Sequence, residues 1–421
     1  MRIAIRLIFT FFVVSIFIAC STQSEGKRGS AQVKTDLYYL ASDSLEGRET
    51  GYKGAEKAAL FIEERFKAMG LTPAGENGTY FQSFDFMPHP PIQQHTTEKG
   101  AQMGMALVKE LSSSNVIGFL DNKAEETIII GAHYDHVGWG ASNSFHTGEP
   151  AIHNGADDNA SGVSSLLELI GRLSETDLKH NILFICFSGE EKGLYGSNYF
   201  CDHPTISMEK VNCMLNMDMV GRLNESNTLA VNGSGTSPIW EAEVNYANAD
   251  SLQLIFSESG VGPSDHTSFY LEDIPVLHFF TGQHDDYHKP TDDSDKINYE
   301  GIVLVANLIE RLVIGLDNNQ SMEFTRTKDS DPENTPAFKV TLGVIPDYLF
   351  NGIGMRIDGV SEDRPAHTAG IIGGDIVVQM DDHIVTDMNT YMEGLAMWEK
   401  GDSAMITVVR NGERKPFMVG W

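Results

Sequence analysis

Apolar residues between about residues 120 and 320 come in short continuous runs that are separated by longer amphipathic segments. Four such runs are TIIIGAH from Thr127, NILFICFSG from Asn181, VNCMLNMD from Val211 and IPVLHFF from Ile274. The intervening segments repeat apolar residues at helical spacing, as in residues 166–173 and 302–316. Strands that are apolar on both faces are typical of a parallel sheet covered by helices, which is the α/β fold class we predict.

An earlier helix is predicted by the same periodicity. Residues 36–52 read as a glycine-rich loop, and the segment that follows places Ala58, Ile62, Phe66 and Met69 on one helical face. Gly70 is the predicted end of that helix. In an open α/β sheet the loops beyond the carboxyl ends of the strands carry the ligand site, so the site is expected there.

The first residues have the pattern of an export signal. Arg2 and Arg6 precede the apolar residues 7–19, a run that is too short to span a bilayer comfortably. Ile18-Ala19-Cys20 resembles a bacterial lipoprotein cleavage box. We therefore predict a signal peptide over residues 1–19 and lipidation at Cys20; a simple secretory signal with an incidental cysteine is the alternative.

A polar segment follows, and it predicts the arrangement at the membrane. Residues 20–35 are small and polar, as in a flexible tether. The protein is thus expected to be exported and lipid-anchored to a bacterial membrane, periplasmic or at the cell surface. The lipid anchor is its only predicted membrane contact.

The chain's length of 421 residues favours two or three domains. Residues 36–317 hold the alternating pattern and form the predicted catalytic domain. Residues 318–337 have prolines and charges without periodicity, as in a linker. Residues 338–421 contain short strand patterns, several glycines and one helical stretch near residues 388–397, which indicates a separate small domain.

Charge and cysteine content exclude some classes of function. The chain has 30 Lys and Arg against 59 Asp and Glu, a formal charge of -29, and no basic cluster. Nucleic acid is therefore excluded as a partner. Cys186, Cys201 and Cys213 form no C-x-x-C pair, so neither a disulfide framework nor a thiolate zinc site is predicted; a bridge between Cys201 and Cys213 stays open.

Acidic residues and histidines recur where the predicted strands end or helices begin. They are His133 and Asp135, Asp157 and Asp158, Glu190 and Glu191, Asp218, and Tyr287 with His288. Any one of these is weak evidence, but their recurrence at the sheet edge indicates a metal centre.

Asp135 follows His133 by two residues, and residues i and i+2 of an extended segment share a face. Its carboxylate could therefore accept the imidazole N–H that is not used on metal. His136 and His146 have no partner at that spacing and are interpreted as loop histidines. Of the adjacent Glu190 and Glu191, one could bind metal while the other handles a proton, and sequence alone does not decide which.

Five separated motifs resemble, in order, the zinc aminopeptidases of metallopeptidase family 28. They are GAHYDH, IHNGADDNASG, FSGEEKGLYGS, NMDMVGR and DYHKPTDD, and LASDSLEGRETG and FKAMGLTPAG fit as well. The resemblance covers about residues 36–315. It implies a zinc-exopeptidase-like fold, with three helix/sheet/helix layers around a mostly parallel, mixed central sheet.

The resemblance also implies roles, residue by residue. The implied metal ligands are His133, Asp158 as the bridge, Glu191, Asp218 and His288. Glu190 takes the position of the general acid/base, Asp135 supports His133, and Tyr287 is a candidate for polarising the scissile carbonyl, with a packing role as the alternative. The implied cofactor is a pair of zinc ions, with cobalt or manganese possible, and a hydroxide bridging the two ions would attack the peptide bond.

Three local choices depend on this resemblance. Asp158 rather than Asp157 matches the bridging position, and Asp157 is expected to accept backbone N–H groups near the helix start. His284 and His288 could both reach metal, and Tyr-His-x-Pro favours His288. Asp265-His266 resembles a family segment near the substrate pocket and is given no role.

The C-terminal segment resembles a PDZ domain, most clearly in PAHTAGIIGGDIVVQMDDHIV. Gly352-Ile353-Gly354-Met355 resembles the carboxylate-binding loop of such domains. The resemblance implies a small α+β domain that could bind peptide C-termini by strand addition; a degenerate module that only packs on the catalytic domain is the alternative.

The expected function is a metal-dependent aminopeptidase acting on peptides with a free N-terminus. A glutaminyl cyclase-type acyltransferase has the same fold with a single zinc, and a non-catalytic peptide-binding scaffold is a third possibility. All five implied metal ligands and Glu190 are present in the sequence, which favours the peptidase.

Overall fold

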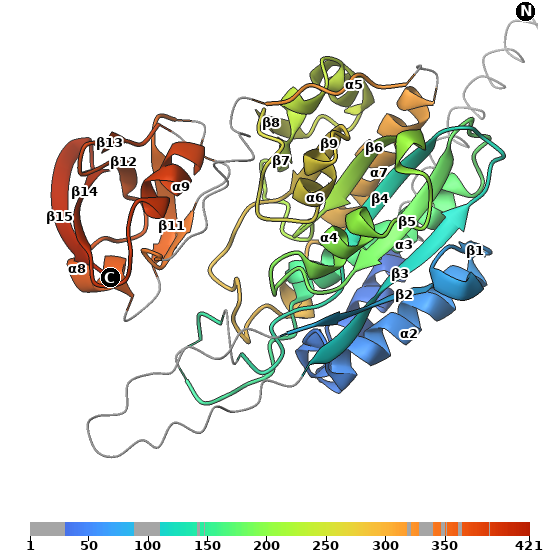
Figure 1. Cartoon of the computed structure of the whole chain (residues 1–421), viewed down its shortest axis with the longest axis horizontal. Helices are drawn as coiled ribbons and strands as arrows, with labels where there is room; N and C mark the ends of the chain where they lie inside the picture. The colour runs from blue at the N-terminus through green and yellow to red at the C-terminus, as the bar shows by residue number, and fades with distance from the viewer. Residues whose placement is uncertain are drawn as a thin grey trace, which may run out of the picture.

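The computed structural model describes residues 30–87, 110–140, 144–146, 148–317, 321–327, 340–346, 350, 352–360, 364–386 and 388–421. Within them, a nine-stranded sheet forms the larger unit and a six-stranded sheet the smaller one (Figure 1). Each sheet has its own hydrophobic core.

The nine-stranded sheet has the order β1-β3-β5-β4-β6-β9-β7-β8, with β2 also paired to β3. Its four central strands are parallel and are the four apolar runs predicted from the sequence. They are β5 (Asn181–Phe187), β4 (Thr127–His133), β6 (Val211–Met217) and β9 (Val276–Phe280). The predicted parallel core of the fold is therefore confirmed.

The strands that flank the four central strands pair with them antiparallel, which the apolar pattern did not predict. On one side β3 pairs antiparallel with β5, and on the other β7 pairs antiparallel with β9. The bounds are β1 (Thr72–Pro73), β2 (Phe81–Phe86), β3 (Leu111–Leu120), β7 (Thr228–Asn232) and β8 (Gln253–Ser257). The sheet is thus mixed, as the family resemblance implied.

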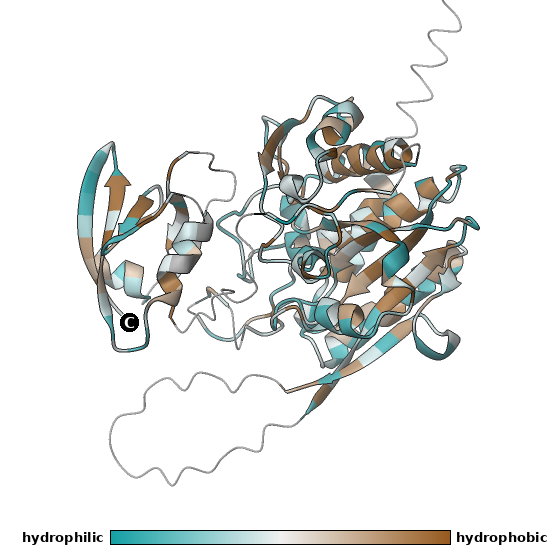
Figure 2. Ribbon diagram, turned by 45° about the horizontal axis from the view of Figure 1, so that its top comes forward, coloured by the Kyte–Doolittle hydropathy of each residue, from teal (hydrophilic) through white to brown (hydrophobic). Residues whose placement is uncertain are grey.

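Helices cover both faces of this sheet (Figure 1). Successive residues of β4 show this: Ile128 and Ile130 belong to one core cluster, whereas Ile129 belongs to another. The helices contributing to the first cluster are α2 (Lys53–Ala68), α3 (Gly162–Leu173), α5 (Trp240–Ala247) and α7 (Tyr299–Leu316). The helices contributing to the second are α4 (Tyr195–Asp202) and α6 (His266–Leu271). The result is the three-layer arrangement expected of the fold, and the strands between the helix layers are largely hydrophobic (Figure 2).

The expected tether is wrong at its C-terminal end. Residues 30–40 are helical, and Val33, Leu37 and Leu40 are buried in the main core. The sequence interpretation missed this because Val33 is a single apolar residue within a polar stretch. Residues 1–29, which include the expected signal peptide and Cys20, lie outside the described residues. Within the described ranges, no helix has the length and apolar character needed to cross a membrane.

The expected linker also begins too early. Residues 321–327 pack on the large unit: Thr325 donates its backbone N–H to the Thr236 carbonyl, and Thr327 is buried against the hydroxyl of Tyr270. The remaining residues of the predicted linker lie outside the described ranges. The large unit therefore extends to about residue 327.

The smaller unit has the sheet order β10-β11-β12-β14-β15, with β13 paired to β12. Its strands are β10 (Val344–Pro346), β11 (Met355–Val360), β12 (Ile376–Met380), β13 (His383–Ile384), β14 (Ser403–Arg410) and β15 (Glu413–Gly420), and its helices are α8 (Pro365–Ala369) and α9 (Met388–Ala396). β11, which follows the Gly352-Ile353-Gly354 segment, pairs with both β10 and β12. A peptide adding as an outer strand beside this segment would therefore pair with β10, which lies at the end of the sheet.

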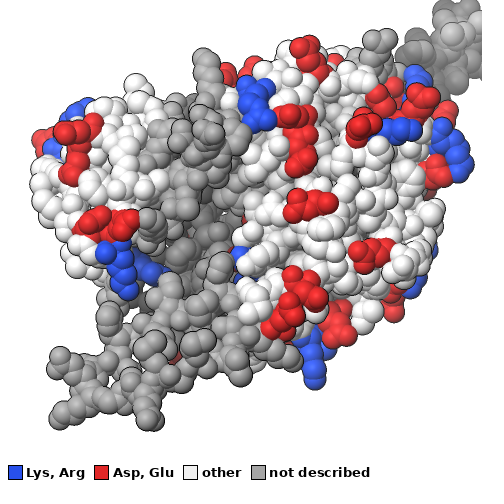
Figure 3. Space-filling model, in the orientation of Figure 1, with Lys and Arg blue, Asp and Glu red and all other residues white. Residues whose placement is uncertain are grey.

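The three described cysteines are unpaired. Cys186 and Cys213 are buried in the sheet core and Cys201 is partly buried, so no bridge joins Cys201 to Cys213. On the face of the molecule seen in Figure 3, acidic side chains are spread over the surface and basic ones are scattered, without an extended basic patch.

Candidate metal centre

The predicted ligands lie at or beyond the carboxyl ends of the parallel strands, on the loops that follow them. His133 is the last residue of β4, Asp218 directly follows β6, and Glu191 lies four residues beyond β5. Asp158 lies in a single π-helical turn (Ala156–Ser161) before α3, and His288 lies in the loop after β9. Because β4, β5, β6 and β9 are parallel, these loops meet at their carboxyl ends.

The first group of donor atoms consists of His133, Asp158 and Asp218. His133 Nε2 lies 3.3 Å from Asp218 Oδ1 and 3.4 Å from Asp158 Oδ1. Tetrahedral zinc with bonds of 2.0–2.1 Å separates its ligand atoms by about 3.3 Å. The spacing of this group therefore matches that of a metal ligand set.

The second group contains the other oxygen of Asp158. His288 Nε2 lies 3.1 Å from Asp158 Oδ2 and 3.1 Å from Glu191 Oε2. His136 joins this group, since its Nδ1 atom lies 2.9 Å from Glu191 Oε1. In each group all donor atoms lie within 4.8 Å of one another. Asp158 is thus shared between the two groups through different oxygens.

The electrostatics of these groups favour a cation. Burial raises the pKa of Asp158, and the nearby Glu191 carboxylate raises it further. Burial lowers the pKa of His133 and His288, but facing carboxylates raise both well above the ordinary histidine value. Without metal, therefore, protons are drawn into the cluster. Carboxylate and imidazole donors of this kind suit zinc and related divalent ions, so the residues present fit a metal centre.

Asp158 is positioned by backbone and side-chain contacts from a distant loop. Asp292 Oδ2 accepts the backbone N–H groups of Asp157 (2.9 Å) and Asp158 (3.1 Å). Gly155, just before this turn, has φ +54°, and a Cβ there would come within 2.1 Å of the Asp158 carbonyl oxygen. The peptide bond between Asp158 and Asn159 is cis.

Asp157 does not contact either group of donors. Its Oδ1 accepts the backbone N–H of Gly221 at 2.6 Å, and its Oδ2 lies 3.1 Å from His284 Nε2. Asp157 therefore does accept a backbone N–H, but from the loop after β6 rather than from its own helix. His284 is partnered by Asp157, and His288 is the histidine beside Asp158 and Glu191.

Glu190 is placed beside the metal groups by a tight turn. Gly189 has φ +81°, a conformation that favours glycine, and turns the chain after β5. The backbone N–H of Glu190 then donates to Asp135 Oδ1 at 3.3 Å. Burial raises the pKa of the Glu190 carboxyl well above its ordinary value; His133 opposes this rise, and the carboxylates of Glu191 and Asp218 add to it. These features suit a side chain that exchanges a proton.

The expected contact from the Asp135 carboxylate to His133 is wrong. His133 Nδ1 donates to the backbone carbonyl of Asp135 at 3.2 Å, whereas the nearer carboxylate oxygen is 3.8 Å away. The carboxylate instead accepts from the Thr50 hydroxyl at 2.6 Å and from the Glu190 backbone. Strand β4 ends at His133, whereas the i, i+2 argument assumed that the extended segment continued to Asp135. Asp135 thus orients His133 through its backbone and Glu190 through its side chain.

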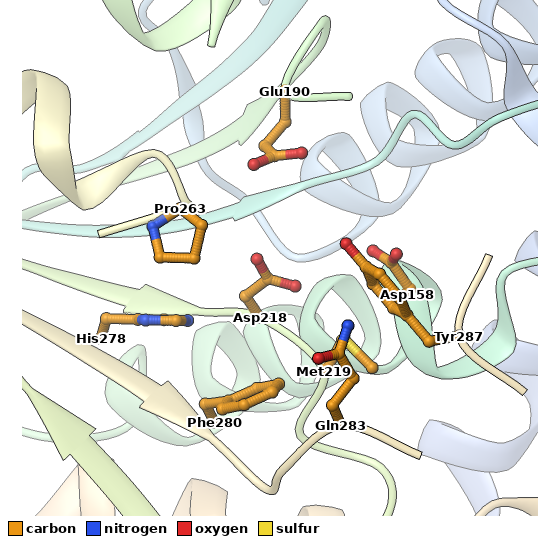
Figure 4. A pocket seen from close by; sticks show the side chains of 9 residues that line it. All are labelled: Asp158, Glu190, Asp218, Met219, Pro263, His278, Phe280, Gln283 and Tyr287. Atoms are coloured by element: carbon orange, nitrogen blue, oxygen red, sulfur yellow. The ribbon is translucent and has the colours of Figure 1, made fainter. Parts of the chain in front are cut away.

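A pocket opens on the first group of donors (Figure 4). Glu190 and Asp218 point toward each other across it, Tyr287 lies beside Asp158, and His278 forms part of the wall. The apolar part of the lining consists of Met219, Pro263 and Phe280. Burial lowers the pKa of His278 to about 4, so this ring is neutral at physiological pH.

Several residues at the site were missed by sequence reasoning. Arg48 is fully buried and donates to the carbonyl groups of Leu40, Tyr134, Asn154 and Gly155, which ties together the loops that carry the ligands. Thr50 and Asp292 hold Asp135 and Asp158. His136 was interpreted as a loop histidine because its partner, Glu191, is 55 residues away. The family-like segment LASDSLEGRETG contains Arg48 and Thr50 and was the one available signal for them.

The large unit is similar in sequence to proteins of a known family. Residues 115–313 match the family model described as Peptidase family M28. The chain is 28% identical over 233 residues to aminopeptidase YwaD of Bacillus subtilis (strain 168), covering 52% of this chain and 48% of that protein. The chain thus spans about half the length of the curated relatives that it matches.

Two solved structures show the same fold at low sequence identity. The first is BSAP, a zinc aminopeptidase from Bacillus subtilis, with 19% identity, a TM-score of 0.54, and coverage of 71% of this chain and 98% of that one. The second is a glutaminyl cyclase from Bacteroides thetaiotaomicron bound to N-acetylhistamine, with 17% identity, a TM-score of 0.52, and coverage of 69% and 98%. The large unit of this chain is thus similar to Peptidase family M28 over residues 115–313, and its fold is that of the two solved structures.

Proposed function

We propose that the protein is a metal-dependent aminopeptidase that uses two zinc ions to remove N-terminal residues from peptides. The observation that carries the proposal is the pair of donor groups that share Asp158, next to Glu190 and an open pocket. When bound, two divalent ions would polarise the scissile carbonyl group and lower the pKa of the attacking water.

Glu190 has the role of general acid/base in this proposal. Its carboxylate takes a proton from the attacking water and delivers it to the amine that leaves. The raised pKa supports this role, since a carboxyl with a pKa nearer to neutrality can both accept and return a proton at physiological pH. Asp135 holds the Glu190 backbone, and Thr50 holds Asp135.

Tyr287 is proposed to donate its phenolic hydrogen to the scissile carbonyl oxygen as negative charge develops there. The side chain lines the pocket beside Asp158 (Figure 4). Its ring stacks on His288, with ring centroids 3.9 Å apart, which limits its movement.

The substrate is proposed to be a peptide with a free N-terminus. Glu190 lines the pocket beside the two donor groups, where its carboxylate can accept a hydrogen bond from the N-terminal amino group. Met219, Pro263 and Phe280 supply an apolar surface for the first side chain. Apolar N-terminal residues should therefore be removed faster than acidic ones.

The adjacent glutamates provide a matched test of these roles. Glu190→Gln should keep its zinc but lose activity on aminoacyl p-nitroanilides by about two to four orders of magnitude, the usual contribution of a general acid/base. Glu191→Gln should instead lose zinc from one site. An active Glu190→Gln variant would refute the assigned role, and a wild-type enzyme that survives complete chelation would refute metal catalysis.

A glutaminyl cyclase-type reaction is the alternative enzyme function, and its fold is shared. The two complete donor groups around Asp158 favour the peptidase, since a cyclase of this fold is expected to hold a single zinc. Incubation with a peptide that begins with glutamine separates the two, because release of free glutamine indicates the peptidase and conversion to pyroglutamate without cleavage indicates the cyclase.

Two further expectations complete the proposal. The smaller unit would bind peptide C-termini along β10, and Cys20 would anchor the exported chain to a bacterial membrane through its lipid. Membrane fractionation of wild type and Cys20→Ser tests the anchor, and titration with a labelled C-terminal peptide tests the smaller unit.

A further inference from the structure

We infer that His136 is a positioning residue that holds Glu191 in place for the second metal group and thereby sets the affinity of that group for its ion. The inference rests on the proposed metal-dependent function. It assigns a role to a histidine beyond the five ligands expected from the sequence.

The two oxygens of Glu191 have different partners. Oε2 lies 3.1 Å from His288 Nε2, which lies equally close to Asp158 Oδ2, so this oxygen faces the place where an ion would be held. Oε1 lies 2.9 Å from His136 Nδ1, at hydrogen-bond distance. His136 Nδ1 is 3.6 Å from Asp158 Oδ2, which is too long for a hydrogen bond. The specific contact of His136 is therefore with Glu191.

The other ring nitrogen indicates where the proton lies. His136 is fully buried, and its Nε2 has no hydrogen-bond partner among the described residues. If Nδ1 bound metal directly, the proton would be on Nε2, where the buried N–H group would have no acceptor among the described residues. With the proton on Nδ1, the ring donates to Glu191 Oε1, and Nε2 is left as an unpaired lone pair, which is also unfavourable when buried. Only the second arrangement forms the bond to Glu191, so it is favoured.

The position of the ring is determined by its surroundings. The backbone N–H of His136 donates to the Arg48 carbonyl at 3.2 Å, and Glu49 pairs with His136 in a short bridge. The ring lies against Gly155, where an added Cβ would come within 2.5 Å of two of its carbons. His136 therefore presents Nδ1 from a rigid position, and partners of metal-binding carboxylates that hold them in this way affect metal affinity by about 10–100-fold.

The experiment compares zinc binding by wild type, His136→Ala and His136→Asn. Asparagine places an amide N–H close to the position of Nδ1, so it can keep the bond to Glu191 while removing the imidazole. His146→Asn is the matched control, because it removes an exposed histidine whose ring contacts the Glu149 carbonyl and the edge of the His153 ring and belongs to neither donor group. Affinities are measured by competition with a zinc chelator, without substrate, and unfolding of the chelated variants is recorded by circular dichroism to verify that they fold.

His136→Ala should weaken one of two zinc sites by about 10–100-fold and leave the other unchanged. His136→Asn should restore most of that affinity, and His146→Asn should have no effect. X-ray absorption of the variants with both zinc sites filled should show the same number of imidazole ligands in wild type and His136→Asn.

Two results would overturn the inference. One is unchanged affinity at both sites in His136→Ala. The other is loss of an imidazole ligand from zinc in His136→Asn, which would make His136 a ligand instead. A wild-type protein that binds no zinc would refute the proposed function itself, so the two failures are distinguishable.

Discussion

Substitution of Thr50 tests whether its hydrogen bond to Asp135 stabilises the contact between the N-terminal loop and the metal centre. Its hydroxyl donates to Asp135 Oδ2 at 2.6 Å in a fully buried environment. Thr50→Val keeps the shape of the side chain and removes only this donor. The Asp135 carboxylate then keeps the longer bond from the Glu190 backbone, at 3.3 Å.

The expected loss of stability follows from the kind of bond. A hydrogen bond to a charged group contributes about 1.5–3 kcal/mol, and a buried carboxylate that loses a donor is not compensated by water. With about 2 kcal/mol lost, the melting temperature of a unit of this size should fall by about 4 °C. Burial already raises the pKa of Asp135, and loss of the Thr50 bond should raise it further. The bond stabilises mainly the ionised carboxylate, so the difference from wild type should be largest near pH 7 and shrink as acid protonates Asp135.

The assay is urea unfolding of chelated wild type, Thr50→Val and Thr50→Ser at several pH values. Serine keeps the hydroxyl and should recover most of the lost free energy of unfolding. A Thr50→Val protein as stable as wild type at pH 7, or a loss that grows on acidification, would refute the reasoning. Kinetics of the zinc-loaded variants would then show whether Glu190 has also moved, as a lower kcat with similar zinc content.

Other predictions address the shared aspartate, the turn before it and the pocket wall. Asp158→Ala should lose both zinc ions, whereas Asp218→Ala should retain one, as measured by elemental analysis. Gly155→Ala should impair zinc binding because of its positive φ and the close Asp158 carbonyl, whereas Gly171→Ala in α3, where an added Cβ meets nothing within 4 Å, should be neutral or slightly stabilising. His278 has a pKa of about 4 in the folded protein, below the ordinary histidine value, so the unfolded chain binds more protons between pH 6.5 and 4. The free energy of unfolding should therefore decrease by about 3 kcal/mol as the pH falls from 6.5 to 4. Chelated His278→Leu should lack this part of the pH dependence in urea unfolding, and an unchanged slope would contradict the assignment.

The sequence alone determined the central strands, the main helices and the residues of the two donor groups other than His136. Continuous apolar runs predicted β4, β5, β6 and β9 because strands buried on both faces need apolar residues at every position. The ordered motifs identified His133, Asp158, Glu191, Asp218 and His288, which lie at strand ends, before a helix or in the loops that follow strands that the pattern had already located. Strand β3, which pairs antiparallel with β5, was not predicted, because LSSSNVIGFL mixes serines with apolar residues.

Only the tertiary structure decided which groups meet across the chain. It placed His136 beside Glu191, Thr50 beside Asp135 and Asp292 under the turn that carries Asp158, pairs separated by 55, 85 and 134 residues. It also showed that His133 Nδ1 bonds to the backbone of Asp135 rather than to its carboxylate. Local periodicity predicts which face of a helix or strand is buried. The partners of these side chains depend instead on how distant loops meet at the carboxyl end of the sheet, and the loops meet only in the folded chain.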